Sequence, residues 1–117
     1  MQEFRIERQT DIPLIFDGDL LADLTSREED HQERWQEIRI YRTSSGKYVT
    51  EIVGMSVLPT DRIFRTVKIG NTPNDVREAL FRRRGERRYL NDLSLDALEE
   101  AAENDPDMAD LMSGERI

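Results

Sequence analysis

The fold is decided by residues 34–57, RWQEIRIYRTSSGKYVTEIVGMSV. In the first half, Ile38 and Ile40 alternate with Glu37 and Arg39. In the second half, apolar residues again share one face, at Val49, Val53, Met55 and Val57. A period of two residues is typical of a strand with one apolar face, and the intervening SSGK favours a short turn. The segment therefore predicts a β-hairpin.

A third antiparallel strand is expected after this hairpin. Residues 62–70, RIFRTVKIG, continue the alternation, with apolar side chains on one face at Ile63, Val67 and Ile69. Three arginines of these strands are Arg39, Arg42 and Arg65. We expect them at solvent-facing or edge positions, where long charged side chains discourage association between sheet edges.

The N-terminal part favours further strands. Phe4 and Ile6 share one face, which suits an edge strand. Residues 12–26, IPLIFDGDLLADLTS, have two interpretations. They form either two strands separated by a turn at Gly18, or one strand followed by a short helix through Leu20, Leu21 and Leu24. We prefer two strands.

The period changes after Gly70 and predicts a helix over residues 72–84. Thr72 is a good N-cap, Pro73 suits the first helical position, and one face carries Val76, Ala79, Leu80 and Arg83. Gly85 is a natural C-cap residue. Arg82, Arg83 and Arg84 would then occupy the last turn, where cations interact favourably with the helix dipole.

Two more helices are expected at the C-terminus. Residues 92–104 place Leu95, Leu98 and Ala102 inward, and residues 105–112 begin with Asp105 as cap and Pro106 at the first position. The predicted fold class is α+β: an antiparallel β-meander of four or five strands followed by two or three C-terminal α-helices packed on the sheet. We expect a sheet part over 1–70, a helical part over 71–112 and a frayed tail over 113–117.

Length and composition restrict the class of protein. The 117 residues suit one domain, and 37% hydrophobic against 36% charged residues is typical of a small core beneath a charged surface. The absence of cysteine excludes disulfides, thiolate metal sites and cysteine nucleophiles. No apolar run suggests a signal peptide or a membrane span. We therefore expect a cytoplasmic protein with a single domain over 1–117 and no membrane partner.

Charge is distributed unevenly along the chain. Residues 92–117 hold nine acidic residues and one arginine, which accounts for the whole net charge of −8. Residues 62–91 hold nine basic and three acidic residues, and five of those bases lie in FRRRGERRY, residues 81–89. The arginine run has three possible explanations: pairing with the tethered acidic segment, binding of nucleic acid, or binding of an acidic protein.

The sequence carries no signature of catalysis, of a cofactor or of a metal site. The single histidine, His31, lies in a charged loop without other ligands at the spacing a metal needs. Glu28, Glu29 and Asp30 lie in the same loop, but the frame of a calcium loop is missing. The SSGKY sequence lacks the first glycine of a phosphate loop, and a strand follows it. We therefore expect no enzyme activity.

Two functions from different classes remain. The first is a small acidic protein–protein interaction module, an accessory or inhibitory subunit of a bacterial or mobile-element system. Its acidic helices would bind a basic partner surface through Asp96, Glu99, Glu100, Glu103, Asp107 and Asp110.

The alternative is a nucleic-acid-binding subunit. Aromatic residues interleaved with arginines on a sheet are typical of single-strand platforms. The residues that would form this surface are Arg82, Arg83, Arg84, Arg87, Arg88, Trp35 and Tyr41. The aromatic residues of the hairpin also suit a second role, as lids over the ends of a small core. The oligomeric state is not predicted by either function.

Overall fold

Five strands form one antiparallel sheet in the computed structural model of the chain, which describes residues 1–29 and 31–114. They are β1 (Gln2–Ile6), β2 (Leu14–Thr25), β3 (Arg34–Thr43), β4 (Tyr48–Ser56) and β5 (Phe64–Gly70), in that spatial order. Next come α1 (Pro73–Leu80), a two-stranded hairpin of β6 (Arg82–Arg84) and β7 (Arg87–Tyr89), α2 (Asp92–Asn104) and α3 (Pro106–Met112). The predicted α+β class, with a meander followed by C-terminal helices, is confirmed.

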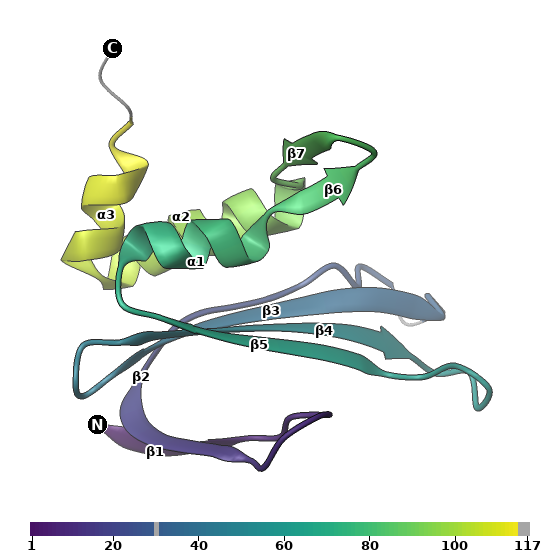
Figure 1. The fold of residues 1–117 in the computed structure, drawn as a ribbon. Coiled ribbons are helices and arrows are strands. Elements are labelled where there is room, and N and C mark those ends of the chain that lie inside the picture. The colour runs from purple at the N-terminus through teal and green to yellow at the C-terminus, as the bar shows by residue number, and fades with distance from the viewer. Residues whose placement is uncertain (30, 115–117) are drawn as a thin grey trace.

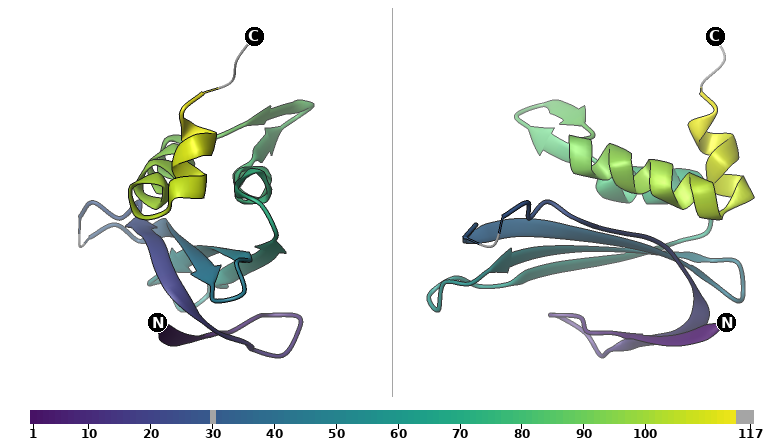
Figure 2. Two further views of the ribbon diagram at one scale, coloured as in Figure 1. Left: turned by 90° about the vertical axis from the view of Figure 1, so that its left-hand side faces the viewer. Right: turned by 180° about the vertical axis from the view of Figure 1, so that it is seen from behind.

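The sheet has a hydrophobic cluster on each side. The helices cover one face, while β1 and the first part of β2 curl beneath the other (Figure 1, Figure 2). The cluster between sheet and helices includes Ile38, Ile40, Tyr48, Leu80, Leu98 and Met108. The cluster under the sheet contains Ile6, Tyr41 and Val49, with Phe4, Leu14, Phe16 and Val67 packed against it. One meander therefore supports two small cores.

Strand β2 supplies side chains to both clusters because it contains a β-bulge. Leu20 pairs with Tyr41 and Ala22 pairs with Ile40, so Leu21 is an extra residue in the ladder. Tyr41 belongs to the lower cluster, whereas Ile40 belongs to the upper one. An extra residue shifts the alternation of side chains by one position. The apolar positions of β2 therefore change face at the bulge.

The predicted turn at Gly18 is wrong, because β2 continues through this residue. Within residues 12–26 the chain forms one long strand, Leu14–Thr25, and neither two strands nor a helix. A Cβ atom at Gly18 would lie 2.2 Å from the carbonyl oxygen of Arg42 on the neighbouring strand. Glycine is needed here for the close approach of two backbones, which is a common role of glycine inside a strand.

The hairpin predicted over residues 34–57 and the third strand after it are confirmed. Ile38 lies opposite Ile52, and Ile40 lies opposite Thr50. The turn between β3 and β4 has Gly46 at a φ of 86°, a conformation that glycine adopts without steric cost.

The start of α1 also follows the prediction. The Thr72 side chain accepts a hydrogen bond from the Asp75 amide, and the Asp75 side chain accepts one from the Thr72 amide. This reciprocal pair is a capping box.

The buried face of α2 differs from the predicted one. Leu98 is buried and Ala102 packs against the core, but Leu95 is 39% exposed. The other buried positions of the helix are small residues, at Ser94, Ala97 and Ala101. Small side chains let α2 approach β2 closely. The face with these small residues is therefore buried, and Leu95 lies outside it. No helix in the described residues is long and apolar enough to cross a membrane.

Part of the predicted frayed tail, residues 115–117, lies outside the described residues.

Candidate functional site

The arginine run forms a β-hairpin, so the prediction that Arg82–Arg84 end a helix is wrong. Helix α1 ends at Leu80, and Phe81 is extended, with φ −60° and ψ 136°. Gly85 has a φ of 64°, and no other residue type has a positive φ in the described residues. A two-residue loop with glycine left-handed in its first position corresponds to a type II′ turn. Gly85 therefore turns a hairpin where we expected it to cap a helix.

Like charges lie opposite each other across this hairpin. Arg83 pairs with Arg88, and Arg84 pairs with Arg87. Same-sign side chains in direct opposition destabilise an antiparallel pair, on a scale of about 0.2–1 kcal/mol for cross-strand interactions. The hairpin therefore carries a repulsion that a bound anion would relieve.

Two of the five arginine side chains contact residues outside the hairpin. Arg88 forms an ion pair with Glu78 of α1 at 2.9 Å, and its guanidinium lies 4.2 Å from the ring centre of Phe81. Nη2 of Arg82 donates to Oε1 of Gln36 on β3 at 3.1 Å. The other three side chains are exposed and make no ion pair or hydrogen bond with any described residue: Arg83, Arg84 and Arg87.

The acidic residues of α2 and α3 keep much of their charge unpaired. Four of the six predicted carboxylates are exposed and have no ion-pair partner in the described part of the chain: Asp96, Glu99, Glu103 and Asp110. We call these four residues the acidic face. The hairpin and α3 lie at opposite ends of the helical layer (Figure 1). No ion pair joins an arginine of the hairpin to the acidic face within the described residues, so the arginines do not neutralise it.

The two other predicted acidic residues already have bonds within the protein. Oε2 of Glu100 accepts from the backbone amide of Asp23 at 3.0 Å. Oδ2 of Asp107 lies 2.8 Å from Nη2 of Arg42. Both anchor the helices to the sheet, which makes them less available to a partner than the acidic face.

Asp105 stands at the N-cap of α3 as predicted, but its side chain does not cap the helix. The carboxylate is buried and accepts from Arg42 at 2.7 Å and from the hydroxyl of Tyr48 at 2.5 Å. Burial raises the pKa of Tyr48, and the bond to Asp105 acts in the same direction. Arg42 lies on a central strand and binds the helical layer, so its predicted solvent-facing or edge position is wrong.

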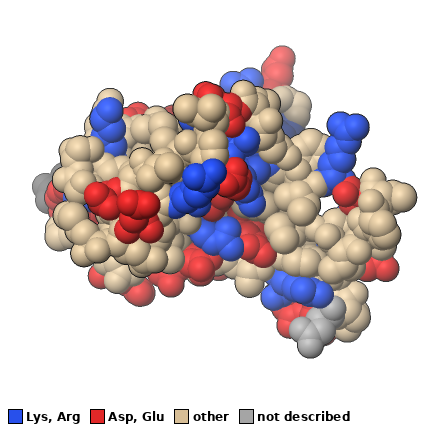
Figure 3. All heavy atoms as spheres, turned by 90° about the horizontal axis from the view of Figure 1, so that it is seen from below, with Lys and Arg blue, Asp and Glu red and all other residues tan. Residues whose placement is uncertain are grey.

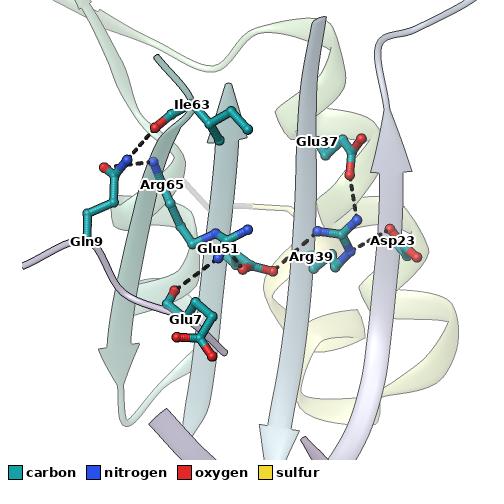
Figure 4. A network of polar contacts seen from close by, with 8 residues as sticks. All are labelled: Glu7, Gln9, Asp23, Glu37, Arg39, Glu51, Ile63 and Arg65. Atoms are coloured by element: carbon teal, nitrogen blue, oxygen red, sulfur yellow. Dashed lines mark hydrogen bonds and ion pairs between the residues drawn. The ribbon is translucent and has the colours of Figure 1, made fainter. Parts of the chain in front are cut away.

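Arg65 lies on the edge strand β5, as predicted, whereas Arg39 lies on the central strand β3 and is partly buried. They belong to a row of alternating charges across the sheet, in which Arg39 contacts Asp23 at 3.2 Å and Glu51 at 3.4 Å, and Arg65 contacts Glu51 at 3.4 Å (Figure 4). Arg39 also contacts Glu37. The strand register explains two of these contacts, because Asp23 on β2 and Glu51 on β4 are the direct cross-strand neighbours of Arg39 on β3. Positive and negative atoms accordingly intermingle on the face opposite the helices (Figure 3).

The loop between β1 and β2 closes the curl of the sheet. The side-chain amide of Gln9 donates to the carbonyl of Ile63 and accepts from the backbone amide of Arg65 at 3.1 Å (Figure 4). The guanidinium of Arg65 also donates to the carbonyl of Glu7 at 3.4 Å. These bonds occupy backbone groups beside β5, an edge strand that would otherwise be open to pairing with another chain.

The predicted aromatic platform beside the arginine run is not formed. Tyr41 is buried in the lower cluster, on the side of the sheet away from the helices, and burial raises its pKa to about 12. Trp35 is partly buried, and its ring is covered by Arg27, whose guanidinium lies 4.1 Å from the ring centre. Tyr41 is therefore unavailable for stacking, and the Trp35 ring, which lines a cleft at the end of the sheet, is covered by Arg27.

His31 lies at the surface, with Nε2 2.7 Å from Oε2 of Glu29. Asp30, which belongs to the same acidic stretch of the sequence, lies outside the described residues. Across residues 1–29 and 31–114, no group of three or more side chains is arranged to hold a metal ion.

Sequence reasoning missed a cleft at the end of the sheet. Gln36, Gly54 and Phe64 lie side by side on β3, β4 and β5, and they line a cavity of 480 Å³. Phe64 is 69% exposed. The signal was Phe64 itself, because the alternation in residues 62–70 places this aromatic residue on the face opposite to Ile63, Val67 and Ile69.

The rim of this cleft is charged. Arg34 and Asp61 form an ion pair there at 2.7 Å, and Arg62 is exposed. Hydrogen bonds from Arg34 and from Ser56 lower the pKa of Asp61 to about 2. Asp61 is therefore neutralised by Arg34, while Arg62 has no partner among the described residues.

Comparison of the chain with family models, with curated proteins and with solved structures gives no significant match in any of the three.

Proposed function

We propose that this protein is a small acidic interaction module that acts in the cytoplasm, without catalysis, and binds a partner protein through the acidic face of α2 and α3. The partner presents a basic surface. In this role the chain is an accessory or inhibitory subunit of a bacterial or mobile-element system. An acidic helical surface can also imitate the charge spacing of phosphates and so occupy a nucleic-acid-binding protein.

One observation supports this proposal most directly. In the described residues, the acidic face has no ion pair with any of the five arginines at 82–88. Asp96, Glu99 and Glu103 recur at spacings of three and four residues, and like charges at these spacings destabilise a helix by about 0.2–0.5 kcal/mol for each pair. The last turn of α2 has no basic residue and holds Glu103 near the negative end of the helix dipole. A basic partner would relieve both costs.

The acidic face is also held rigidly. Nδ2 of Asn104 donates to the carbonyl of Leu21 at 2.9 Å, which fixes the C-terminal end of α2 against β2. Glu100 and Asp105 add the bonds to Asp23 and Arg42 described above. A surface that is ordered before binding loses less conformational entropy on association.

The test compares a charge-reversal variant with a matched control. The variant Asp96→Lys/Glu99→Lys/Glu103→Lys changes only exposed side chains of the acidic face and leaves Glu100 in place. The control Glu3→Lys/Asp19→Lys/Glu33→Lys makes the same change in net charge elsewhere on the surface. The wild-type protein first identifies the partner by affinity capture, and the purified partner is then used for stopped-flow association.

We expect the acidic-face variant to associate at least about tenfold more slowly at low salt, because electrostatic steering is lost. Circular dichroism should show that it remains folded. The control should associate at a rate much closer to that of the wild type. An unchanged rate in the variant, or an equal loss in the control, would reject the acidic face as the binding surface.

A further inference from the structure

We propose that the cleft at the end of the sheet, together with the neighbouring β6–β7 hairpin, binds single-stranded nucleic acid. The hairpin would bind the phosphates and the floor of the cleft would receive a base. This site is separate from the acidic face, and the proposal does not depend on the partner protein proposed above.

The floor of the cleft suits a flat aromatic ligand. Gly54 lies between Gln36 and Phe64 in one row across three strands, so only backbone separates these two side chains. Phe64 is mostly exposed although it lies within a strand. Stacking on an exposed aromatic ring is how proteins hold unpaired bases without preference for sequence.

The hairpin presents one of its faces to this floor. The bond from Arg82 to Gln36 shows which face it is, because Gln36 lines the cleft. Residues that alternate along a strand or lie opposite across a ladder share a face. Three further side chains therefore lie on the same face as Arg82: Arg84, Arg87 and the exposed Tyr89.

The positive charge around the cleft is available to phosphates. Arg84 and Arg87 repel each other across the hairpin, and Arg62 is exposed on the rim of the cleft. Within the described residues, none of these three has a partner. A phosphate backbone would relieve the repulsion and would release counterions on binding. Helix α3 lies at the other end of the helical layer (Figure 1), and no acid of the acidic face pairs with an arginine of the hairpin in the described residues.

A single strand fits this arrangement better than a duplex. The cavity of 480 Å³ lies within the range of about 300–1,000 Å³ of small-ligand sites. In a duplex the bases are paired and stacked, so they cannot lie against Phe64, whereas a single strand presents its bases freely.

The experiment is a fluorescence-anisotropy titration of the full chain. The probes are labelled oligothymidylate and oligouridylate of about ten nucleotides, within the usual site sizes of single-strand binding proteins, and a duplex of the same length. Each is titrated at low and at physiological salt. We expect saturable binding of the single strands, weaker binding of the duplex and a steep loss of affinity with salt.

Four variants locate the site. Arg84→Ala/Arg87→Ala should weaken binding by at least about tenfold because two phosphate contacts are lost, and Phe64→Ala by at least about fivefold because stacking is lost. Gly54→Val should also weaken binding by filling the floor. A Cβ atom at Gly54 meets Phe64 only at 3.7 Å, so this variant should fold. The control Arg5→Ala/Lys47→Ala removes equal charge from exposed positions outside the cleft and should bind like the wild type.

Several results would overturn the proposal. One is the absence of saturable binding at low salt. Others are an equal loss of affinity in the control and duplex binding as tight as that of the single strand. Displacement of the single strand by a poly-glutamate peptide at a similar concentration would also overturn it, and would assign the hairpin to an acidic protein.

Discussion

Arg42 on β3 and Asp105 at the junction of α2 and α3 form the ion pair that ties the sheet to the helical layer, with Nη1 of Arg42 2.7 Å from Oδ1 of Asp105. The carboxylate is only 4% exposed and also accepts from the hydroxyl of Tyr48. The guanidinium of Arg42 lies 4.9 Å from the ring centre of Tyr48. These contacts fix the position of both helices, and with them the position of the acidic face.

Asp105→Asn should lower the free energy of unfolding by about 2–3 kcal/mol, because a buried charged acceptor is replaced by an amide that satisfies Arg42 and Tyr48 poorly. Urea denaturation measures this change. The matched control is Asp107→Asn, which removes a bond to the same arginine from a side chain that is 55% exposed. Solvent screens that bond, so the control should stay within about 0.5 kcal/mol of the wild type. Equal effects of the two changes would contradict the role of Asp105.

Glu51→Gln should also destabilise the protein, by about 1–3 kcal/mol, because Glu51 is buried and contacts both Arg39 and Arg65. Arg39 keeps its contacts with other acids, whereas Arg65 loses its only carboxylate in the described residues. The control Asp23→Asn removes a half-exposed member of the same row and should have a much smaller effect. Thermal and urea unfolding of both variants measure the two losses of stability. A loss in Asp23→Asn that equals or exceeds the loss in Glu51→Gln would contradict the prediction.

The sequence predicted the parts of the fold that rest on local patterns. Residues 34–57 and 62–70 alternate with a period of two and form the expected strands, and Thr72 begins a helix as expected. Gly85 was misinterpreted because a helix C-cap and a type II′ turn both place glycine at a positive φ. Only the pairing of β6 with β7 distinguishes these alternatives.

Other features depend on contacts between distant residues. Gly18 resembles a turn residue in sequence, and its role becomes clear only when Arg42 lies against it. The buried face of α2 was set by its fit to β2 and not by the largest side chains. The cleft also joins residues from three strands and from the loops beside them, so its floor at Gly54 and Phe64 could not be assembled from the sequence alone.

The pH dependence of stability should show the effect of the Arg34–Asp61 pair. The folded pKa of Asp61 is about 2, below the value of about 3.9 expected in the unfolded chain. A lowered pKa gives a contribution that is complete above about pH 4 and is lost as the pH falls toward about 2. Asp61→Asn should therefore lose less stability than the wild type between about pH 5 and pH 2.

Denaturation in urea at several pH values measures this difference. Asp75 provides a second case, since hydrogen bonds from the backbone amides of Asn71 and Thr72 lower its pKa in the same direction. Identical pH profiles for the wild type and Asp61→Asn would show that the pair does not persist in solution.

Both proposals require that the arginine hairpin and the acidic face remain separate surfaces, each open to a partner. The most direct test is the free energy of unfolding of Arg83→Ala/Arg84→Ala/Arg87→Ala at low and at high salt. Separate surfaces predict a stability equal to that of the wild type or higher by up to about 1 kcal/mol at low salt, because like charges no longer face each other across the hairpin. A loss of about 1 kcal/mol or more at low salt that disappears at high salt would show instead that the arginines pair with the protein's own acids.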